Sequence, residues 1–240
     1  MNELKRAIEN LYSNFGDYTT VGIHYCDCGC VKEEDVKKLH SKPLRELENE
    51  DLISFHGSAL YTWGDIEHYK HFLPRICELI SVKRDFGYVT LDEVKNKLDF
   101  AEWTKWPENE RKAILDYVLA DWVDFSTQNI SEITDREIAM YAVFFNIEDV
   151  LSNWKILDTE IALRNFINFF YFHGSQIFNS GLRIGDRKYK QEFLNWINLD
   201  QIIPKLEQSY FDNVTNTDDF ADKISIVLQM IEQQMKVNGR

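Results

Sequence analysis

The sequence lacks the features that mark exported and membrane-spanning chains. It has no apolar run of about 18 residues, the length that a membrane span requires. Its first residues, MNELKRAIENLYSNF, form an amphipathic pattern in place of a charged segment followed by an apolar core. We therefore expect a soluble, cytoplasmic protein. In that reducing compartment, its four cysteines should be thiols or metal ligands and not disulfides.

Catalytic motifs are also missing. No glycine-rich phosphate loop precedes a strand, no serine stands in a nucleophile elbow, and no pair of carboxylates has a recognisable catalytic spacing. The sequence thus gives no positive support for an enzyme. It leaves open an enzyme whose catalytic groups converge only in three dimensions.

Basic residues are scarce relative to acidic ones. The chain has 27 Lys and Arg against 40 Asp and Glu, and the net charge of −13 disfavours binding to nucleic acid through bulk charge. The imbalance is strongest between Glu108 and Glu160, where twelve acidic residues face four basic ones, a net of −8. Such a surface is usually only solvated, and otherwise it receives a basic partner.

Glycine and proline are too few to interrupt the chain often. None of the 10 glycines lies between Gly87 and Gly174, whereas three lie at 174, 181 and 185. The first interval therefore favours continuous helices, and the second favours a long loop. Apolar residues recur at steps of three and four along most of the chain, which predicts about ten helices and scarcely a strand.

These patterns predict one all-α domain over residues 1–240. Successive capped helices joined by short turns favour antiparallel pairs stacked side by side, as in a HEAT-like α-solenoid. No fixed repeat period can be aligned along the chain, so an irregular helical bundle is an equal alternative.

Local signals locate several helix boundaries. Thr90 with Glu93, and Thr134 with Glu137, have the spacing of capping boxes at helix starts. Pro74 cannot donate a backbone hydrogen bond, so we expect a kink or a fresh helix start at that position.

A cysteine-rich turn at residues 24–31 contains the candidate metal ligands, which are His24, Cys26, Cys28 and Cys30. Thiolate and imidazole are the ligands that zinc prefers. The spacing differs from that of common zinc sites, because side chains at intervals of two spread too far along an extended backbone to reach one ion. A turn at Gly29 would bring Cys28 and Cys30 together, and His40 or Cys77 could complete the set. The alternative is a thiol cluster without a metal.

Two histidines, His68 and His71, lie one helical turn apart near Asp65. Histidines at that spacing can share a metal, but the four-residue pairing of zinc proteases, with its glutamate, is absent. We favour structural histidines. Arg75 is expected to form an ion pair with Asp65 or Glu78 that fixes the helix corner.

A basic patch ends the predicted loop that follows His173. It consists of Arg183, Arg187, Lys188 and Lys190, interrupted only by Asp186. A solvated loop is the favoured interpretation, and binding of an anion or an acidic peptide is the alternative.

Short motifs in the first third of the chain carry a resemblance. The cysteine turn is followed by PLREL at 43–47, TWGD at 62–65 and FLPR at 72–75, of which FLPR is the most specific. This order resembles an uncharacterised bacterial protein family with a short cysteine motif followed by PLR-L, TWGD and FLPR. In that family the cysteines resemble a compact metal-binding pair, from which the triplet here departs. The resemblance implies a bacterial, cytoplasmic origin and supplies no activity.

The leading functional hypothesis is a cytoplasmic helical protein that recognises another protein and has a small structural metal site, with zinc as the candidate ion. One version is a toxin-neutralising or defence-associated bacterial protein whose acidic face meets a basic partner. A competing hypothesis is a metal-dependent enzyme that uses the cysteine and histidine cluster. A third is a redox-responsive protein in which Cys26, Cys28 and Cys30 oxidise reversibly without a metal.

Overall fold

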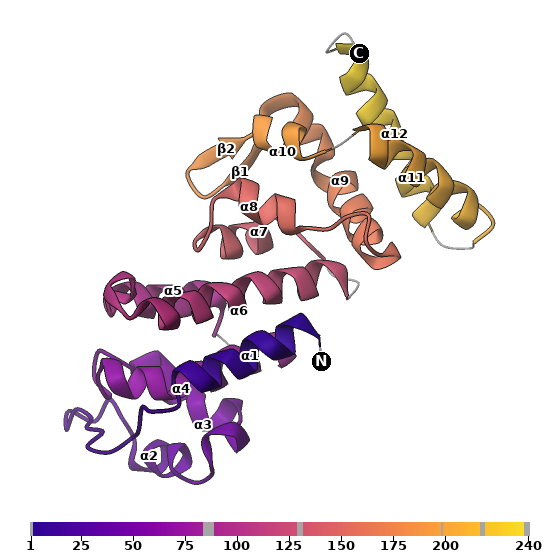
Figure 1. The fold of residues 1–240 in the computed structure, drawn as a ribbon. Coiled ribbons are helices and arrows are strands. Elements are labelled where there is room, and N and C mark those ends of the chain that lie inside the picture. Colours follow the sequence, from indigo (N-terminus) through magenta and orange to yellow (C-terminus); the bar gives the residue numbers. More distant parts are fainter. Residues whose placement is uncertain (1, 84–88, 129–131, 198, 217–218, 238–240) are drawn as a thin grey trace. The chain divides into compact units, whose positions relative to one another are not determined.

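The computed structural model describes residues 2–83, 89–128, 132–197, 199–216 and 219–237. Within these ranges the chain is mainly helical, and its β-sheet has two strands (Figure 1). The prediction of an all-α fold is confirmed. Contacts divide the chain into two compact units, Met1–Asp121 and Trp122–Arg240, with the boundary inside one helix, α6 (Glu108–Thr127). The assignment of residues 1–240 to one domain stays a prediction.

The N-terminal unit is built from short and medium helices. They are α1 (Glu3–Asn14), α2 (Glu33–Leu39), η1 (Leu44–Glu46), α3 (Asn49–Ser58), α4 (Ile66–Lys83), α5 (Leu91–Phe100), η2 (Trp103–Lys105) and the first part of α6. Helix α1 packs on α4, and α2 packs on its sequence neighbour α3. The start of α1 is fixed by Asn2, whose side chain accepts a hydrogen bond from the Lys5 backbone nitrogen.

Helix α4 runs through Pro74 without a fresh start, so of the kink or restart that we expected, the restart is wrong. Proline removes the hydrogen bond to the carbonyl of Lys70, four residues earlier. The flanking side chains Leu73 and Ile76 are fully buried, so tertiary packing holds the helix together across the missing bond. The capping box of Thr134 and Glu137 forms as predicted.

The C-terminal unit contains the remaining helices and the sheet. After α6 come α7 (Asp135–Ala142), α8 (Ile147–Asn153), α9 (Glu160–Ser180), β1 (Leu182–Ile184), β2 (Arg187–Tyr189), α10 (Gln191–Trp196), α11 (Leu199–Asn213) and α12 (Phe220–Val237). Helix α12 contacts both α9 and α11, while α8 contacts α7 and α10. Strand β1 packs against α7 and α9.

The long loop predicted after Gly174 is wrong, because α9 continues to Ser180 and a β-hairpin follows. Gly174 lies inside the helix for a packing reason. A Cβ atom there would lie 3.0 Å from the Met230 sulfur and 3.2 Å from the Phe170 ring, so only glycine lets α12 approach this closely. The helix ends at Gly181, whose φ of +80° suits glycine.

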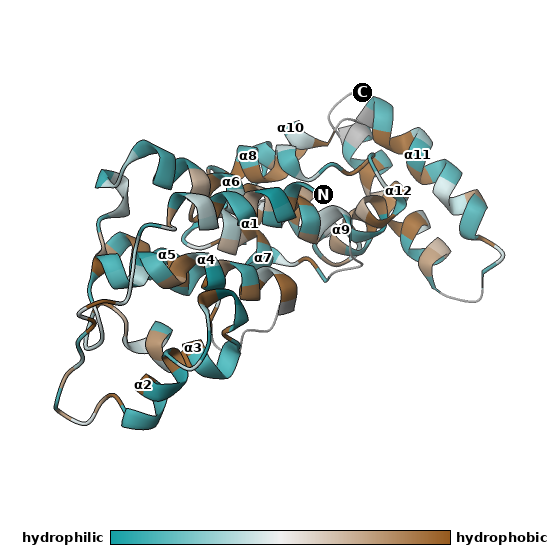
Figure 2. Cartoon of the chain, turned by 60° about the horizontal axis from the view of Figure 1, so that its bottom comes forward, coloured by the Kyte–Doolittle hydropathy of each residue, from teal (hydrophilic) through white to brown (hydrophobic). Residues whose placement is uncertain are grey.

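The helices are amphipathic, and hydrophilic and hydrophobic residues alternate along most of them (Figure 2). Apolar side chains in both units are buried against neighbouring helices. None of the described helices combines the length and the apolarity that crossing a membrane requires.

Candidate metal centre

An irregular segment between α1 and α2 carries the cysteines, and two histidines of α4 fasten its first half. His71 Nδ1 lies 2.7 Å from the carbonyl oxygen of Tyr18, and His68 Nε2 lies 3.2 Å from that of Val21. Burial lowers the pKa of His71. Both imidazoles therefore hold the segment against α4, which is the structural role that we favoured from the sequence.

The N-terminus of α4 forms around Asp65. Its carboxylate accepts hydrogen bonds from the backbone nitrogens of Glu67 and His68 and lies 2.7 Å from His68 Nδ1. Burial raises the pKa of Asp65, but these hydrogen bonds and the nearby His68 outweigh burial and leave the pKa below its ordinary value. Asp65 thus orients the ring that reaches Val21. Arg75 pairs with Glu78 at 2.6 Å, one of the two partners that we predicted.

The TWGD motif anchors the segment just before the cysteines. Gly64 donates its backbone hydrogen to the carbonyl of His24 at 2.7 Å, and Cys26 donates its own to the carbonyl of Thr62 at 2.8 Å. Gly64 has a φ of +67°, and a Cβ atom there would lie 3.0 Å from that of His68. The motif therefore specifies the close approach of two backbone segments.

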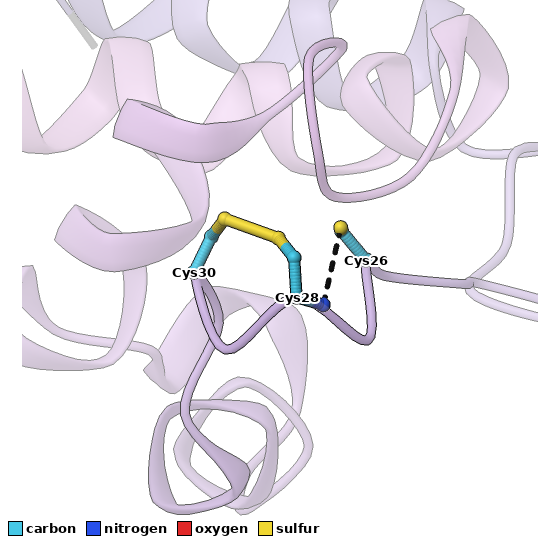
Figure 3. Close-up of a disulfide and its surroundings, with 3 residues drawn as sticks. All are labelled: Cys26, Cys28 and Cys30. Atoms are coloured by element: carbon cyan, nitrogen blue, oxygen red, sulfur yellow. Dashed lines mark hydrogen bonds between the residues drawn. A yellow bond between two sulfur atoms is a disulfide. The ribbon is translucent and has the colours of Figure 1, made fainter.

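The cysteine turn itself brings three sulfur atoms together (Figure 3). All three Sγ atoms, those of Cys26, Cys28 and Cys30, lie within 4.8 Å of one another. Gly29, with a φ of +84°, makes the turn, as the sequence predicted. Cys26 is half-buried and its sulfur accepts a hydrogen bond from the Cys28 backbone nitrogen at 3.3 Å, while Cys28 and Cys30 are exposed.

Cys28 and Cys30 are joined by a disulfide, with their Cα atoms 5.7 Å apart. The expectation that none of the four cysteines forms a disulfide is wrong for this pair. That expectation rested on a reducing compartment, whereas the turn at Gly29 brings the two sulfur atoms close enough to bond. Cys77 is a free thiol, deeply buried in α4, and burial raises its pKa far above the ordinary value.

His24 lies outside this group of sulfur atoms. Its carbonyl is held by Gly64, and its ring packs edge-on against the ring of His68, with the centroids 6.4 Å apart. Among the described residues, the three N-terminal cysteines are the group whose ligand atoms come close together, and neither His40 nor Cys77 belongs to it. The structure therefore assembles three of the four predicted ligands.

The three cysteines could hold a metal ion. Thiolates at about 2.3 Å from a tetrahedral zinc ion lie about 3.8 Å from one another. The sulfur atoms here already lie within 4.8 Å of each other, so a small adjustment of an exposed turn would suffice. Coordination by all three requires reduction of the Cys28–Cys30 disulfide, because only thiolates are strong ligands. Three sulfurs would leave one tetrahedral position for a fourth ligand.

Comparison with protein-family models, with curated proteins and with solved structures found no match to this chain. The resemblance of its motifs to an uncharacterised bacterial family therefore stays a prediction.

Sequence reasoning missed a buried polar network beside the candidate site. Lys70 of α4 and Glu110 of α6 form an ion pair at 2.6 Å, and both side chains are buried. The Tyr18 hydroxyl donates to Glu110 and accepts from Lys70 at 2.9 Å. The network fixes the start of the cysteine-bearing segment, and its members are too far apart in sequence for any spacing to reveal it.

A second missed feature is the buried cation Lys97. Its ammonium donates to the carbonyls of Gly57 at 3.0 Å and Ala59 at 2.8 Å, at the C-terminus of α3, and lies 3.8 Å from the centre of the Tyr61 ring. Burial lowers its pKa to about 8. Lys97 therefore caps the C-terminus of α3, where carbonyl groups favour a cation. This helix end lies just before the TWGD motif.

Proposed function

We propose that this chain is a helical protein-interaction module whose exposed cysteine turn binds a metal ion, with zinc as the favoured ion. The observation that carries the proposal is the convergence of the Cys26, Cys28 and Cys30 sulfur atoms to within 4.8 Å. A set of three thiolates selects soft or borderline metals such as zinc over magnesium or calcium.

The surroundings of the turn support a role in binding a partner. Next to Thr62, which anchors Cys26, the aromatic ring of Tyr61 contacts that of Phe100 with the centroids 4.9 Å apart. Tyr61 is 57% exposed and Phe100 58% exposed. Exposed aromatic pairs are typical of surfaces that bind other proteins.

The acidic segment between Glu108 and Glu160 is a weaker support. Two of its members, Glu110 and Asp121, are buried and do not belong to the surface. The remaining acidic side chains would favour a partner with a basic face. The narrower role of a toxin-neutralising or defence-associated protein depends on this charge alone.

The metal proposal is tested by elemental analysis of the reduced full chain, purified without chelator or affinity nickel. We expect stoichiometric zinc and three protected thiols. Cys28→Ser should abolish zinc retention, whereas the matched control Cys77→Ala should retain it, because Cys77 is buried in α4. Absence of metal, with three freely reactive N-terminal thiols, would contradict the proposal.

The partner proposal has its own measurement. Wild-type protein and a Tyr61→Ser/Phe100→Ser variant are used to capture proteins from a lysate of the host, at low and at high salt. We expect a protein that the wild type retains and the variant loses. Equal recovery by both proteins would contradict a binding role for the aromatic pair.

The Cys28–Cys30 disulfide favours a second candidate function, that of a thiol redox sensor. In this function the two thiols exchange with a small disulfide such as oxidised glutathione. One S–S bond forms within the turn, and two electrons and two protons reduce the small disulfide to two thiols. Reversible loss of two reactive thiols in glutathione buffers, with no metal in the reduced protein, would favour this function over metal binding.

A further inference from the structure

The β1–β2 hairpin carries a net positive charge, whereas the unit to which it belongs carries a net negative charge. The C-terminal unit has 17 Asp and Glu residues against 11 Lys and Arg, a net of −6. Four of those eleven cations lie within residues 183–190, and they are Arg183, Arg187, Lys188 and Lys190. Asp186 is the single acidic residue in that stretch. The hairpin, which lies at an edge of the unit, is therefore a cationic element on an acidic body (Figure 1).

The strand register places two of these cations directly opposite each other. Arg183 pairs with Lys188 across the antiparallel ladder, so both side chains extend from the same face. Both are exposed, while Leu182 and Ile184 alternate with Arg183 and are buried. Like charges opposed in this way destabilise a hairpin. The two apolar side chains therefore attach β1 to the unit, and the cations extend away from that packing.

These cations also differ from exposed lysines elsewhere in the molecule. Lys105 and Lys112 each lie 2.6 Å from a carboxylate one helical turn away. Within the described ranges, Arg183, Arg187 and Lys188 have no carboxylate at ion-pair distance. Their charges face solvent without neutralisation from the chain itself.

We infer that the outer face of this hairpin, with Arg183 and Lys188 at its centre, docks a short acidic segment of a partner protein. Carboxylates between the two side chains would neutralise both cations and remove the repulsion across the strands. Arginine also presents a planar fork that binds a carboxylate through two hydrogen bonds. The inference is independent of the cysteine turn, which belongs to the N-terminal unit.

The charge around the hairpin selects a short acidic peptide over nucleic acid. A long polyanion would extend from the hairpin onto a unit with a net charge of −6, where it would be repelled. A few neighbouring Asp or Glu residues would contact the cations alone. Complementary charge of this kind speeds association and selects the partner.

The test measures binding of a fluorescein-labelled hexaglutamate peptide to the full chain by fluorescence anisotropy, with hexaglutamine as the neutral probe. We expect binding of hexaglutamate alone. Arg183→Ser/Lys188→Ser should weaken it about tenfold, because two charge contacts are lost. Binding should also weaken between about 50 mM and about 200 mM salt, as the screening length shortens.

The matched control is Lys105→Ser/Lys112→Ser, which removes the same charge from exposed positions that already have partners. Its affinity for hexaglutamate should stay within about twofold of the wild type. Equal weakening by the two double variants would show a bulk-charge effect and overturn the inference. The absence of measurable hexaglutamate binding to the wild type would also overturn the inference. Tighter binding of labelled single-stranded DNA, or wild-type self-association that Arg183→Ser/Lys188→Ser abolishes, would assign the hairpin to another partner and overturn it equally.

Discussion

The two units of this protein bury different chemistry. The N-terminal unit buries charged residues and histidines, which are Asp51, His56, His68, Lys70, Arg75, Lys97, Glu110 and Asp121. Among the described residues of the C-terminal unit, the buried polar ones are the neutral Ser126, Thr127 and Asn165, in a core rich in aromatic rings. Packing in the first unit therefore relies on polar pairs such as Lys70 with Glu110, although neither ring nitrogen of His56 has a hydrogen-bond partner among the described residues. Packing in the second unit relies on the fit of large apolar shapes.

This difference explains where the candidate metal centre lies. An irregular segment that carries cysteines must follow one path, and directional hydrogen bonds from buried polar groups can specify that path. Tyr18 and Val21 receive such bonds from Lys70 and His68 of α4, and the carbonyl of His24 accepts one from the backbone of Gly64 in the loop before that helix. Aromatic packing has no comparable means of fixing a loop.

The largest expected effect is in the C-terminal unit. Trp154 is almost fully buried, and its ring lies 5.7 Å from Trp122, 5.3 Å from Trp196 and 5.5 Å from Phe169, measured between centroids. Trp154→Ala should lower the free energy of unfolding of that unit by about 3–5 kcal/mol, because it leaves a large cavity. Urea denaturation followed by circular dichroism measures the loss.

Phe211→Ala is the matched control for Trp154→Ala. Phe211 is 70% exposed, so its loss should change the free energy by less than about 0.5 kcal/mol. A Trp154→Ala effect below about 1 kcal/mol would show that the aromatic cluster does not dominate the unit.

A somewhat smaller effect is expected from the buried ion pair of the N-terminal unit. Glu110→Gln leaves Lys70 buried without its countercharge and should lower the free energy of unfolding by about 3 kcal/mol. The double variant Lys70→Met/Glu110→Leu should recover part of this loss, since no unpaired charge remains. Urea denaturation of the variants measures both effects, and equal destabilisation by the single and the double variant would contradict the explanation.

The third prediction concerns pH. Burial, with a contribution from nearby Lys97, lowers the pKa of His56 from 6.5 to about 3. The folded state thus excludes a proton that the unfolded state binds, so stability is retained above pH 6.5 and is lost as pH falls from 6.5 towards 3. The slope should be about 1.4 kcal/mol per pH unit.

His56→Leu should flatten this slope, which urea denaturation at several pH values measures. His173, in the C-terminal unit, is half-buried and provides the comparison. Its pKa is lowered less far by burial, so His173→Leu should flatten the slope less. An unchanged slope in His56→Leu would mean that other groups cause the acid sensitivity.

The smallest effect is expected at the cysteine turn, which lies outside both cores. In chelator and thiol reductant, Cys28→Ser/Cys30→Ser should change the free energy of unfolding by less than about 1 kcal/mol, because both side chains are exposed. Urea denaturation of the variant and of the reduced wild type, under the same conditions, measures this change in the free energy of unfolding. A loss above about 2 kcal/mol would place the turn in the structural core.

Periodicity in the sequence was sufficient to predict the helices but not their partners. Apolar residues are spread around most faces of α9, and ten of its residues are buried. Gly174 misled the prediction, since glycine normally favours a loop and here it makes room for Met230. Its packing role depends on a residue 56 positions away, which no local pattern contains.

The candidate site was predictable only in the part that depends on residues close together in the sequence. The three cysteines are two residues apart, and Gly29 lies between two of them, so local residues alone form the turn. The structure brings their sulfur atoms together. The backbone of His24 is held by the distant Gly64 and its ring contacts that of the distant His68, which spacing in the sequence does not reveal. The anchoring by Tyr18 and Glu110, 92 residues apart, was equally hidden.

The neighbouring indole rings of the C-terminal unit have a spectroscopic consequence. Trp122, Trp154 and Trp196 form a chain of neighbouring rings, whereas the other three tryptophans belong to the N-terminal unit. Transition dipoles this close couple to one another, so the C-terminal unit should produce an exciton band in the circular dichroism spectrum that is separate from the helical signal. That band would report the melting of one half of the chain without any added label.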